Sequence, residues 1–505
     1  MKNSRVPANA LGSLSALALA LIVSTAAAGA APDDGTPQLR RQGAATQLFV
    51  DGKPFLILGG ELRNSSSSSL EYMAPIWERL EAQNLNTVLA AVSWESVEPE
   101  EGRFDFSVPD GVILQARAHH MHLGLLWLAS WKNGMSSYAP AWVKRDSRRF
   151  PRIRLASGEE PEVISPLGTE AAAADARAFA ALMGHLATLD ARDHTVLLVQ
   201  VENEVGVLGD TRDRSPAAEA AFNGPVPAQW FAYAAEHAPD LVPELKARLV
   251  AAGSRPAGTW TEVFGAGSAT DELFMAWQYA HYVDQVAAAG TAAYPIPLYA
   301  NAWLNEPAAK PGDYPSGGPL AQVLNIWKAA APHLSLLAPD LYASDFAERC
   351  RLFTRAGNAL FIPETNRTAQ SARNLFLAVG SYRAIGYSPF AIDALFPRSI
   401  AEPEADRQAV GKAYGLLRQI APLVLEHQGT GEMVGFVLDK EHPSIVANLG
   451  GAILEIGLDE LFGHRAEVGG GLVMATGPGQ FLGAGSGFRV LFHNPPDVPG
   501  RVGLA

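Results

Sequence analysis

The sequence is poor in cysteine, in positive charge and in long apolar runs. Cys350 is its only cysteine in 505 residues, which excludes an intrachain disulfide and a zinc site built from several cysteines. The formal net charge is -13, which disfavours a nucleic-acid partner because such partners require basic patches. Hydrophobic residues make up 48% of the chain and charged residues 18%, so we predict a globular fold with ample core.

The first 30 residues have the pattern of a secretory signal peptide. Lys2 and Arg5 precede an unbroken apolar run at residues 16–23, and Ala28-Gly29-Ala30 offers a small-x-small cleavage site. The run is shorter than the roughly 20 apolar residues that a bilayer span needs. We therefore predict cleavage that leaves a chain starting near Ala31, no membrane anchor after cleavage, and a periplasmic or secreted protein.

Eight short apolar runs alternate with longer amphipathic stretches, such as residues 73–83 and 169–189. Eight buried strands with crossover helices predict an α/β fold, a (β/α)8 TIM barrel, over residues 45–425. The connection from residue 204 to residue 296 carries an insertion with helical patterns at 227–252 and 271–289. The eight runs are residues 49–61, 86–94, 123–131, 195–204, 296–303, 334–342, 359–364 and 388–393.

The last part of the chain has a different pattern of hydrophobic residues and more glycine. A helical pattern at residues 402–425 is followed by short alternating segments in which glycine is dense. Examples are residues 431–439, 444–450, 452–459 and 487–492. This pattern predicts a small C-terminal all-β domain, β-sandwich-like, over residues 426–505.

The ends of the predicted strands carry the chemistry, because active sites of such barrels gather at the C-terminal ends of the strands. The fourth run ends on Glu202-Asn203-Glu204 and the seventh on Pro363-Glu364. Two carboxylates across one pocket walled by aromatic rings fit glycoside hydrolysis: one acid protonates the leaving oxygen, and the other attacks the anomeric carbon or activates water. The 12 histidines are scattered, so we predict no metal and no cofactor.

The two acids of the Glu-Asn-Glu stretch are expected to differ in role. Alternation along a strand places Glu202 and Glu204 on one side, and both could face the barrel axis. Glu204 lies nearer the rim, where a substrate can reach it, whereas Glu202 is expected to make an internal hydrogen bond or salt bridge. Asp340, at the end of the sixth run, is expected to support the chemistry rather than perform it.

Other residues at the strand ends have two interpretations. The tryptophans could stack on a sugar or fill the barrel, and the additional carboxylates could bind substrate or orient neighbouring loops. The residues predicted to bind substrate are Asn203, Glu61, Trp94, Glu98, Trp131, Asn133, Trp303 and Tyr342.

Four segments resemble known glycosidases. QVENEVG (200–206) resembles the strand-four signature of glycoside hydrolase family 35, in which the second Glu is the acid/base, here Glu204. An Asn-Glu pair at strand four and a Glu at strand seven mark the wider clan A of retaining glycosidases, so Glu364 in FIPETN maps to the nucleophile. SWESVEPEEGRFDF (93–106) is similar to a segment shared by families 35 and 42, and APAWVK (139–144) resembles family 35.

The resemblance extends over most of residues 47–400 and implies a retaining exo-β-galactosidase that releases terminal galactose by double displacement. It implies a carbohydrate substrate, including plant cell-wall oligosaccharides. The chain departs from family 35 at Val97, Val205 and Ser130, the last being where many members carry a sugar-binding Glu. Two alternatives stay open: a clan A glycosidase of another specificity, such as a β-glucosidase or an endo-hydrolase, and a catalytically silent carbohydrate-binding protein.

Overall fold

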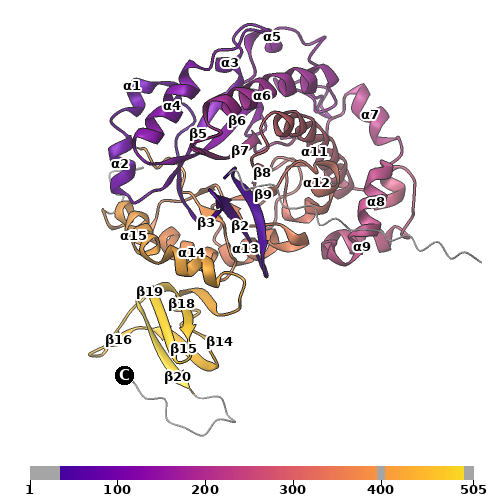
Figure 1. The fold of residues 1–505 in the computed structure, drawn as a ribbon. Helices are drawn as coiled ribbons and strands as arrows, with labels where there is room; N and C mark the ends of the chain where they lie inside the picture. The colour runs from indigo at the N-terminus through magenta and orange to yellow at the C-terminus, as the bar shows by residue number, and fades with distance from the viewer. Residues whose placement is uncertain (1–34, 395–403, 494–505) are drawn as a thin grey trace, which may run out of the picture.

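The computed structural model describes residues 35–394 and 404–493, so the predicted signal peptide lies outside the described residues. A barrel of strands is wrapped by helices, and a small region of β-strands lies below it (Figure 1). This arrangement confirms the predicted fold class, a TIM barrel followed by a C-terminal all-β region. Among the helices that the structure describes, none has the length and apolar character to cross a membrane.

Eight parallel strand segments close the barrel, in the order β10-β12-β4-β5-β6-β7-β8-β9-β11. β10 and β11 are two pieces of one segment interrupted at Pro363, which has no N–H to donate. β10 pairs with β12 and β11 pairs with β9, so this segment closes the sheet. The strands are β4 Ile57–Glu61, β5 Thr87–Ser93, β6 His122–Lys132, β7 Val196–Asn203, β8 Leu298–Trp303, β9 Leu336–Leu341, β10 Phe361–Ile362, β11 Glu364–Thr365 and β12 Gly386–Tyr387.

The helices follow the predicted pattern with two changes. The stretch 73–83 is divided at Pro75 into α1 and α2, and the insertion holds four short helices before the long α11. The predicted helix at 169–189 is confirmed as α6. The helices are α1 Leu70–Met73, α2 Trp77–Ala82, α3 Trp94–Val97, α4 Ser107–Ala118, α5 Ala141–Lys144, α6 Thr169–Leu189, α7 Pro216–Phe222, α8 Ala228–Glu236, α9 Pro243–Ala251, α10 Trp260–Phe264, α11 Ser268–Ala293, α12 Leu324–Ala330, α13 Phe346–Phe353, α14 Ala369–Gly380 and α15 Glu404–His427.

The prediction of a single first strand over residues 49–61 is wrong. β2 Ala45–Val50 and β3 Lys53–Phe55 form an antiparallel hairpin, extended by β1 Gln38–Gln42, and only β4 belongs to the barrel. Asp51 and Gly52 have φ of 51° and 72°, the two left-handed positions that a tight hairpin turn requires. The last strand also differs, because β12 ends before residues 388–393 begin.

The hairpin closes one end of the barrel. Leu48 of β2 belongs to the same buried apolar cluster as Ile57, Leu126 and Phe361, which fill the barrel interior. A second, larger cluster packs the outer faces of the strands against the helices. The apolar filling leaves the opposite end, where the strands terminate, for polar residues.

The C-terminal region contains two three-stranded antiparallel sheets packed on a core of their own, and a two-stranded ribbon of β16 Glu460–Leu461 and β17 His464–Arg465. The predicted segments appear as β13 Met433–Leu438, β14 Ser444–Leu449, β15 Ala452–Leu458 and β20 Phe488–His493. Two glycine-rich strands, β18 Gly469–Gly477 and β19 Gln480–Ser486, were not predicted. Ser381, directly after α14, hydrogen-bonds both backbone groups of Gly435, so this region is attached to the barrel's helical layer. The domain boundary at 426 stays a prediction.

Candidate active site

Polar residues from the ends of the barrel strands meet in a pocket of about 380 Å³. We call it the active-site pocket. It includes five of the predicted site residues, Glu204, Glu364, Asn133, Trp303 and Tyr342. Two more, Glu61 and Asn203, adjoin it and are only 1% exposed. The lining residues are Asn64, Lys132, Asn133, Glu204, Trp303, Leu304, Asn305, Glu306, Asp340, Tyr342, Ala343, Glu364 and Phe390.

Three carboxyl groups converge in this pocket. Glu204 follows β7, Asp340 lies in β9, and Glu364 opens β11. Each presents one oxygen, and the three oxygens lie within 4.8 Å of one another. All three side chains are buried, with exposures of 6% or less. Adjacent parallel strands end at one edge, so their last residues come together although they are far apart in the sequence.

Glu204 is in surroundings that favour its protonated form. Burial, followed by the neighbouring Glu364 carboxylate, raises the pKa of Glu204 to about 7. Hydrogen bonds with Asp340 and Asn133 and the charge of Lys132 act in the opposite direction. Asn133 Nδ2 donates to Glu204 Oε2, and the Glu204 backbone N–H donates to Asn301 Oδ1 at 3.0 Å. Glu204 is therefore held in place and carries a proton near neutral pH.

Glu364 has a different partner. The Tyr342 hydroxyl donates to Glu364 Oε2 at 2.8 Å. The Glu61 carboxyl also hydrogen-bonds the Glu364 side chain. Burial, followed by the charge of Glu364, raises the pKa of Tyr342, so the phenol keeps the proton that it donates. The Glu364 carboxylate is thus oriented by a phenol and a neighbouring acid, and it lines the pocket.

Asp340 and Glu61 lie beside these two acids in surroundings that favour their protonated forms. Burial, followed by the charge of Glu364, raises the pKa of each well above its ordinary value. Asn301 Nδ2 donates to Asp340 Oδ2 at 2.6 Å, and Asp340 hydrogen-bonds Glu204. Lys132 is the one basic residue among those that line the pocket, and its charge lowers the pKa of Glu61. Asp340 therefore supports Glu204, as the sequence suggested.

Several buried polar atoms at this end of the barrel have no protein partner within the described residues. They are the side-chain oxygen and nitrogen of Asn203, Asp340 Oδ1 and the Tyr299 hydroxyl. Buried polar groups are rarely left without a hydrogen bond, because desolvation costs about 1–3 kcal/mol each. Such a set is typical of a site that completes its hydrogen bonds with a polyhydroxylated ligand.

The three acids Glu204, Asp340 and Glu364 are also the group whose spacing, within the described part of the chain, could hold a metal ion. Metal ligands must be deprotonated. Burial raises the pKa of Glu204 and Asp340, and Lys132 already contributes a positive charge to the same pocket. The surroundings of Glu204 and Asp340 thus favour bound protons over a cation.

Glu202 and Glu204 do not share one side, so the expectation from alternation is wrong. Both residues have left-handed backbones, with φ of 63° and 45°, which break the two-residue period of the strand. Glu202 is fully buried and accepts hydrogen bonds from the Ser130 and Trp131 backbone N–H groups at 3.1 and 2.7 Å. It also hydrogen-bonds Asp175 of α6. Its internal role agrees with the interpretation favoured from the sequence.

Three of the residues predicted to bind substrate, Trp131, Trp94 and Glu98, lie away from the pocket. Trp131 is fully buried between Tyr279 and Tyr282, and its indole N–H donates to Ile164 O at 3.0 Å. Strand β6 loses its regular pairing between Trp127 and Lys132, so alternation no longer indicates where Trp131 points. Trp131 therefore packs in the protein core and offers no exposed face to a sugar.

Trp94 and Glu98 were also predicted to bind substrate, and they too lie outside the active-site pocket. The Trp94 indole donates to Glu98 Oε2 at 2.7 Å, and the Gly102 N–H donates to Oε1 at 2.7 Å. Both side chains are buried, and Trp94 packs edge-on against Trp142. Glu98 therefore orients the loop after β5, which is the alternative that the sequence left open. By contrast, Trp303 and Tyr342 are each 41% exposed and line the pocket.

Sequence reasoning missed several lining residues. Asn64 follows β4 and Phe390 follows β12, and both lie in loops whose path the sequence does not reveal. Lys132, which lines the pocket, and Asn301, which hydrogen-bonds Asp340 and the Glu204 backbone, stand at strand ends and could have been chosen by position. Ser130, where the family 35 acid is lacking, points away from the pocket: its hydroxyl donates to Asp175 Oδ2 at 2.7 Å and pairs with the Tyr282 hydroxyl.

Comparisons with known proteins agree with these features. Residues 68–237, which include Asn203 and Glu204, match the profile of glycoside hydrolase family 42, described as β-galactosidase. Residues 410–505 match a domain of unknown function, DUF5597. A β-galactosidase of Xanthomonas manihotis is 31% identical over 209 residues, which cover 39% of this chain and 31% of that relative. The match thus spans about a third of the relative's length.

Solved structures of similar fold include two glycosidases. β-Galactosidase from Bacillus circulans sp. alkalophilus has a TM-score of 0.49 at 14% identity, covering 74% of this chain and 57% of its own. The catalytic domain of β-amylase from Paenibacillus polymyxa has a TM-score of 0.47 at 11% identity, covering 70% of this chain and 98% of its own. The family match and the Xanthomonas relative confirm the resemblance of this chain to the β-galactosidase families of clan A.

Proposed function

We propose that the protein is a retaining exo-β-galactosidase in which Glu204 is the acid/base and Glu364 the nucleophile. The observation that carries the proposal is that these two carboxyl groups approach within 4.8 Å in one pocket while their surroundings differ. Retaining glycosidases place the two groups about 5–5.5 Å apart, whereas inverting enzymes leave about 6.5–9.5 Å for a water molecule. The short separation supports direct attack on the sugar.

The two reaction steps follow from the proton on Glu204. In the first step Glu204 donates that proton to the glycosidic oxygen, and Glu364, oriented by the Tyr342 hydroxyl, attacks the anomeric carbon. The glycosyl ester that forms removes the negative charge of Glu364. That charge is one of the causes that raise the pKa of Glu204, so Glu204 becomes more acidic and can take a proton from the attacking water.

The proposed substrate is a terminal β-galactosyl residue of an oligo- or polysaccharide, such as a plant cell-wall side chain. The family match around Asn203 and Glu204 supports galactose, and the exposed rings of Trp303 and Tyr342 offer faces for a sugar. A panel of nitrophenyl glycosides tests the specificity, because a β-glucosidase would prefer the gluco compound. Release of galactose alone from a galactosylated chain tests exo-action, and binding without turnover would indicate a silent sugar-binding protein.

Substitution of each acid tests the mechanism. Glu364→Ala should abolish turnover, and azide should restore activity with the opposite anomeric configuration by attacking from the vacated side. Glu204→Ala should keep the first step for a dinitrophenyl galactoside, whose leaving group needs little protonation, and then deglycosylate slowly. The expected result is a burst followed by slow turnover, with azide giving the retained β-galactosyl azide.

Glu202→Gln is the matched control, since Glu202 is the neighbouring acid that bonds backbone groups of β6. It should lower stability or activity without either azide product. If Glu202→Gln gave the burst and the retained azide, the assignment of Glu204 would be overturned. We also propose that the enzyme is exported, with a mature chain starting near Ala31, which N-terminal sequencing of the exported protein tests.

A further inference from the structure

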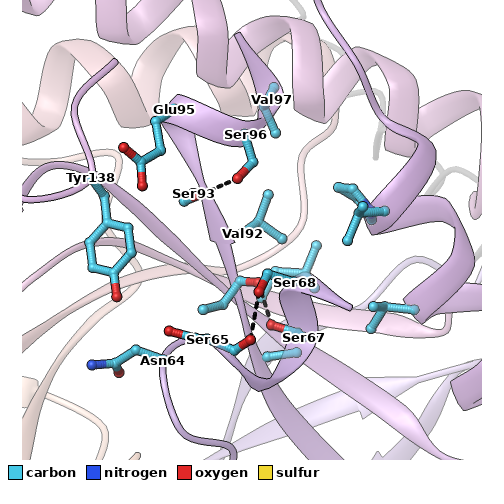
Figure 2. A pocket seen from close by; sticks show the side chains of 16 residues that line it. Asn64, Ser65, Ser67, Ser68, Val92, Ser93, Glu95, Ser96, Val97 and Tyr138 are labelled. Carbon is cyan, nitrogen blue, oxygen red and sulfur yellow. Dashed lines mark hydrogen bonds between the residues drawn. The ribbon is translucent and has the colours of Figure 1, made fainter. Parts of the chain in front are cut away.

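A second pocket, of about 190 Å³, lies between β5, α4 and the loop after β4 (Figure 2). We call it the serine pocket, because three residues of the five-serine run, Ser65, Ser67 and Ser68, line it. The run includes a short 3-10 turn, η1 Ser66–Ser68. The full lining is Asn64, Ser65, Ser67, Ser68, Ala90, Ala91, Val92, Ser93, Glu95, Ser96, Val97, Val108, Pro109, Val112, Leu125 and Tyr138.

The serine pocket adjoins the active-site pocket, because Asn64 lines both. Tyr138 lies on the same side of the serine pocket as Asn64 (Figure 2). Tyr138 belongs to the loop after β6, and the same loop carries Asn133, whose amide donates to the proposed acid Glu204. The second pocket is therefore next to the part of the active site that handles the leaving group.

The chemistry of the lining selects an uncharged, hydroxylated ring. Glu95 is the only charged residue in the lining, and the ammonium group of Lys144, which is not a lining residue, lies 3.5 Å from its carboxylate. The lining itself therefore offers no basic group to an anionic ligand. Half of the lining is aliphatic, including Val92, Val112 and Leu125. This combination of aliphatic wall and hydroxyl rim matches a pyranose, which has an apolar C–H face and a polar edge.

Most of the serine hydroxyl groups that line the pocket can act only as hydrogen-bond acceptors toward a ligand. Ser67 Oγ donates to Ala91 O at 2.7 Å, Ser68 Oγ to Ser65 O at 2.6 Å, and Ser93 Oγ to Ser96 Oγ at 2.7 Å. Their protons are thus committed within the protein, and their lone pairs remain for sugar hydroxyls. The amide of Asn64 and the hydroxyl of Tyr138 complete the rim as donors.

The size of the pocket limits the ligand to one ring. An apolar cavity of about 150 Å³ holds a benzene molecule, so a pocket of 190 Å³ holds one six-membered ring with its hydroxyls and not a chain of rings. In an exo-acting enzyme, the only group attached to the terminal galactose is the leaving group. A second one-ring pocket beside the active site therefore corresponds to the first sugar of that leaving group.

We infer that the serine pocket binds the sugar from which galactose is cleaved, so that the preferred substrates are galactosyl-oligosaccharides rather than galactosides of small alcohols. This inference rests on the proposed function. It assigns a recognition role to the serine run, which the catalytic mechanism does not use.

Filling the pocket tests the inference. Val112 of α4 lines the serine pocket and is 3% exposed, whereas Leu114 of the same helix is 51% exposed and lines neither pocket. kcat/KM is measured for lactose, methyl β-galactoside and 4-nitrophenyl β-galactoside. Val112→Phe should lower kcat/KM for lactose at least about tenfold, the worth of one or two hydrogen bonds, and leave the methyl galactoside unchanged. Leu114→Phe should change neither.

A second, milder variant keeps the test valid if Val112→Phe does not fold. Tyr138→Phe removes one hydroxyl without changing the shape of the ring, and should lower kcat/KM for lactose about threefold relative to the methyl galactoside. Equal effects of Val112→Phe and Tyr138→Phe on all three substrates would overturn the inference, as would no effect of either. A loss confined to the nitrophenyl substrate would overturn the assignment to a sugar. If the parent protein hydrolysed none of the three, the proposed function itself would fail.

Discussion

Replacing Lys132 by Met should move the pH dependence of the reaction to higher pH. Lys132 lines the active-site pocket and is 7% exposed, and its charge lowers the pKa of Glu204 against the effect of burial. An opposite charge at about 4–6 Å typically lowers a carboxyl pKa by about 1–3 units. Met keeps the length of the side chain and removes the charge, so the pKa of Glu204 should rise from about 7 by about one unit or more.

The alkaline limb of the pH profile reports this shift. Glu204 must be protonated to assist departure of a sugar, so kcat/KM for lactose should fall as the pH rises through the pKa of Glu204. The midpoint should lie near pH 7 in the parent protein and at about pH 8 or above in Lys132→Met. A dinitrophenyl galactoside should show a much weaker limb, because its leaving group needs little protonation.

A matched control separates this effect from a general loss of positive charge. Lys246 lies on α9, and its ammonium donates to Pro239 O at 2.7 Å, outside the active-site pocket. Lys246→Met should leave the alkaline limb in place. The reasoning is refuted if Lys132→Met leaves the limb at the parent position or moves it to lower pH, since either result would mean that Lys132 does not stabilise the Glu204 carboxylate.

Three further predictions concern stability and substrate binding. Because burial raises the pKa of Glu204 from 4.5 to about 7, its contribution to stability is fully present below about pH 4.5 and is lost as the pH rises through about 7, a loss of about 3 kcal/mol. Glu204→Gln should therefore match the parent in Tm at pH 4.5 and exceed it at pH 8; a constant difference would contradict this. Trp131→Ala should cost about 3–5 kcal/mol of unfolding free energy, because Trp131 is fully buried. Trp303→Ala should instead raise KM with little change in Tm, and the opposite pattern would reverse their assigned positions.

The order of elements and the convergence of the two acids could be predicted from the sequence, because parallel strands of a barrel place their last residues at one mouth. That rule alone was enough to place Glu204, Glu364 and Tyr342 in the site. The hairpin at Asp51-Gly52 was also readable, since this dipeptide favours left-handed turns, but it lies inside a long apolar run that resembles one strand. The break at Pro75 carried a comparable local signal.

The directions of side chains at the irregular ends of strands could not be predicted. Trp131 follows the point where β6 leaves its regular register, so counting by two from the buried part of the strand no longer applies. Loop residues such as Asn64 and Phe390 reach the pocket by paths that depend on packing between distant segments. The role of Lys132 likewise requires knowing which carboxyl groups surround it, a property of the assembled mouth and not of its neighbours in sequence.

The left-handed backbone at Glu202 and Glu204 explains why an apolar strand can end on two acids. Such a conformation costs a non-glycine residue about 1–3 kcal/mol, so other bonds must maintain it. Glu202 binds two backbone N–H groups of β6, and the Glu204 N–H is held by Asn301. The bend sends Glu202 toward Asp175 in the helical layer and Glu204 into the pocket. A regular strand would have directed both acids at the mouth, adding a carboxyl group to a site where Lys132 is the only basic lining residue.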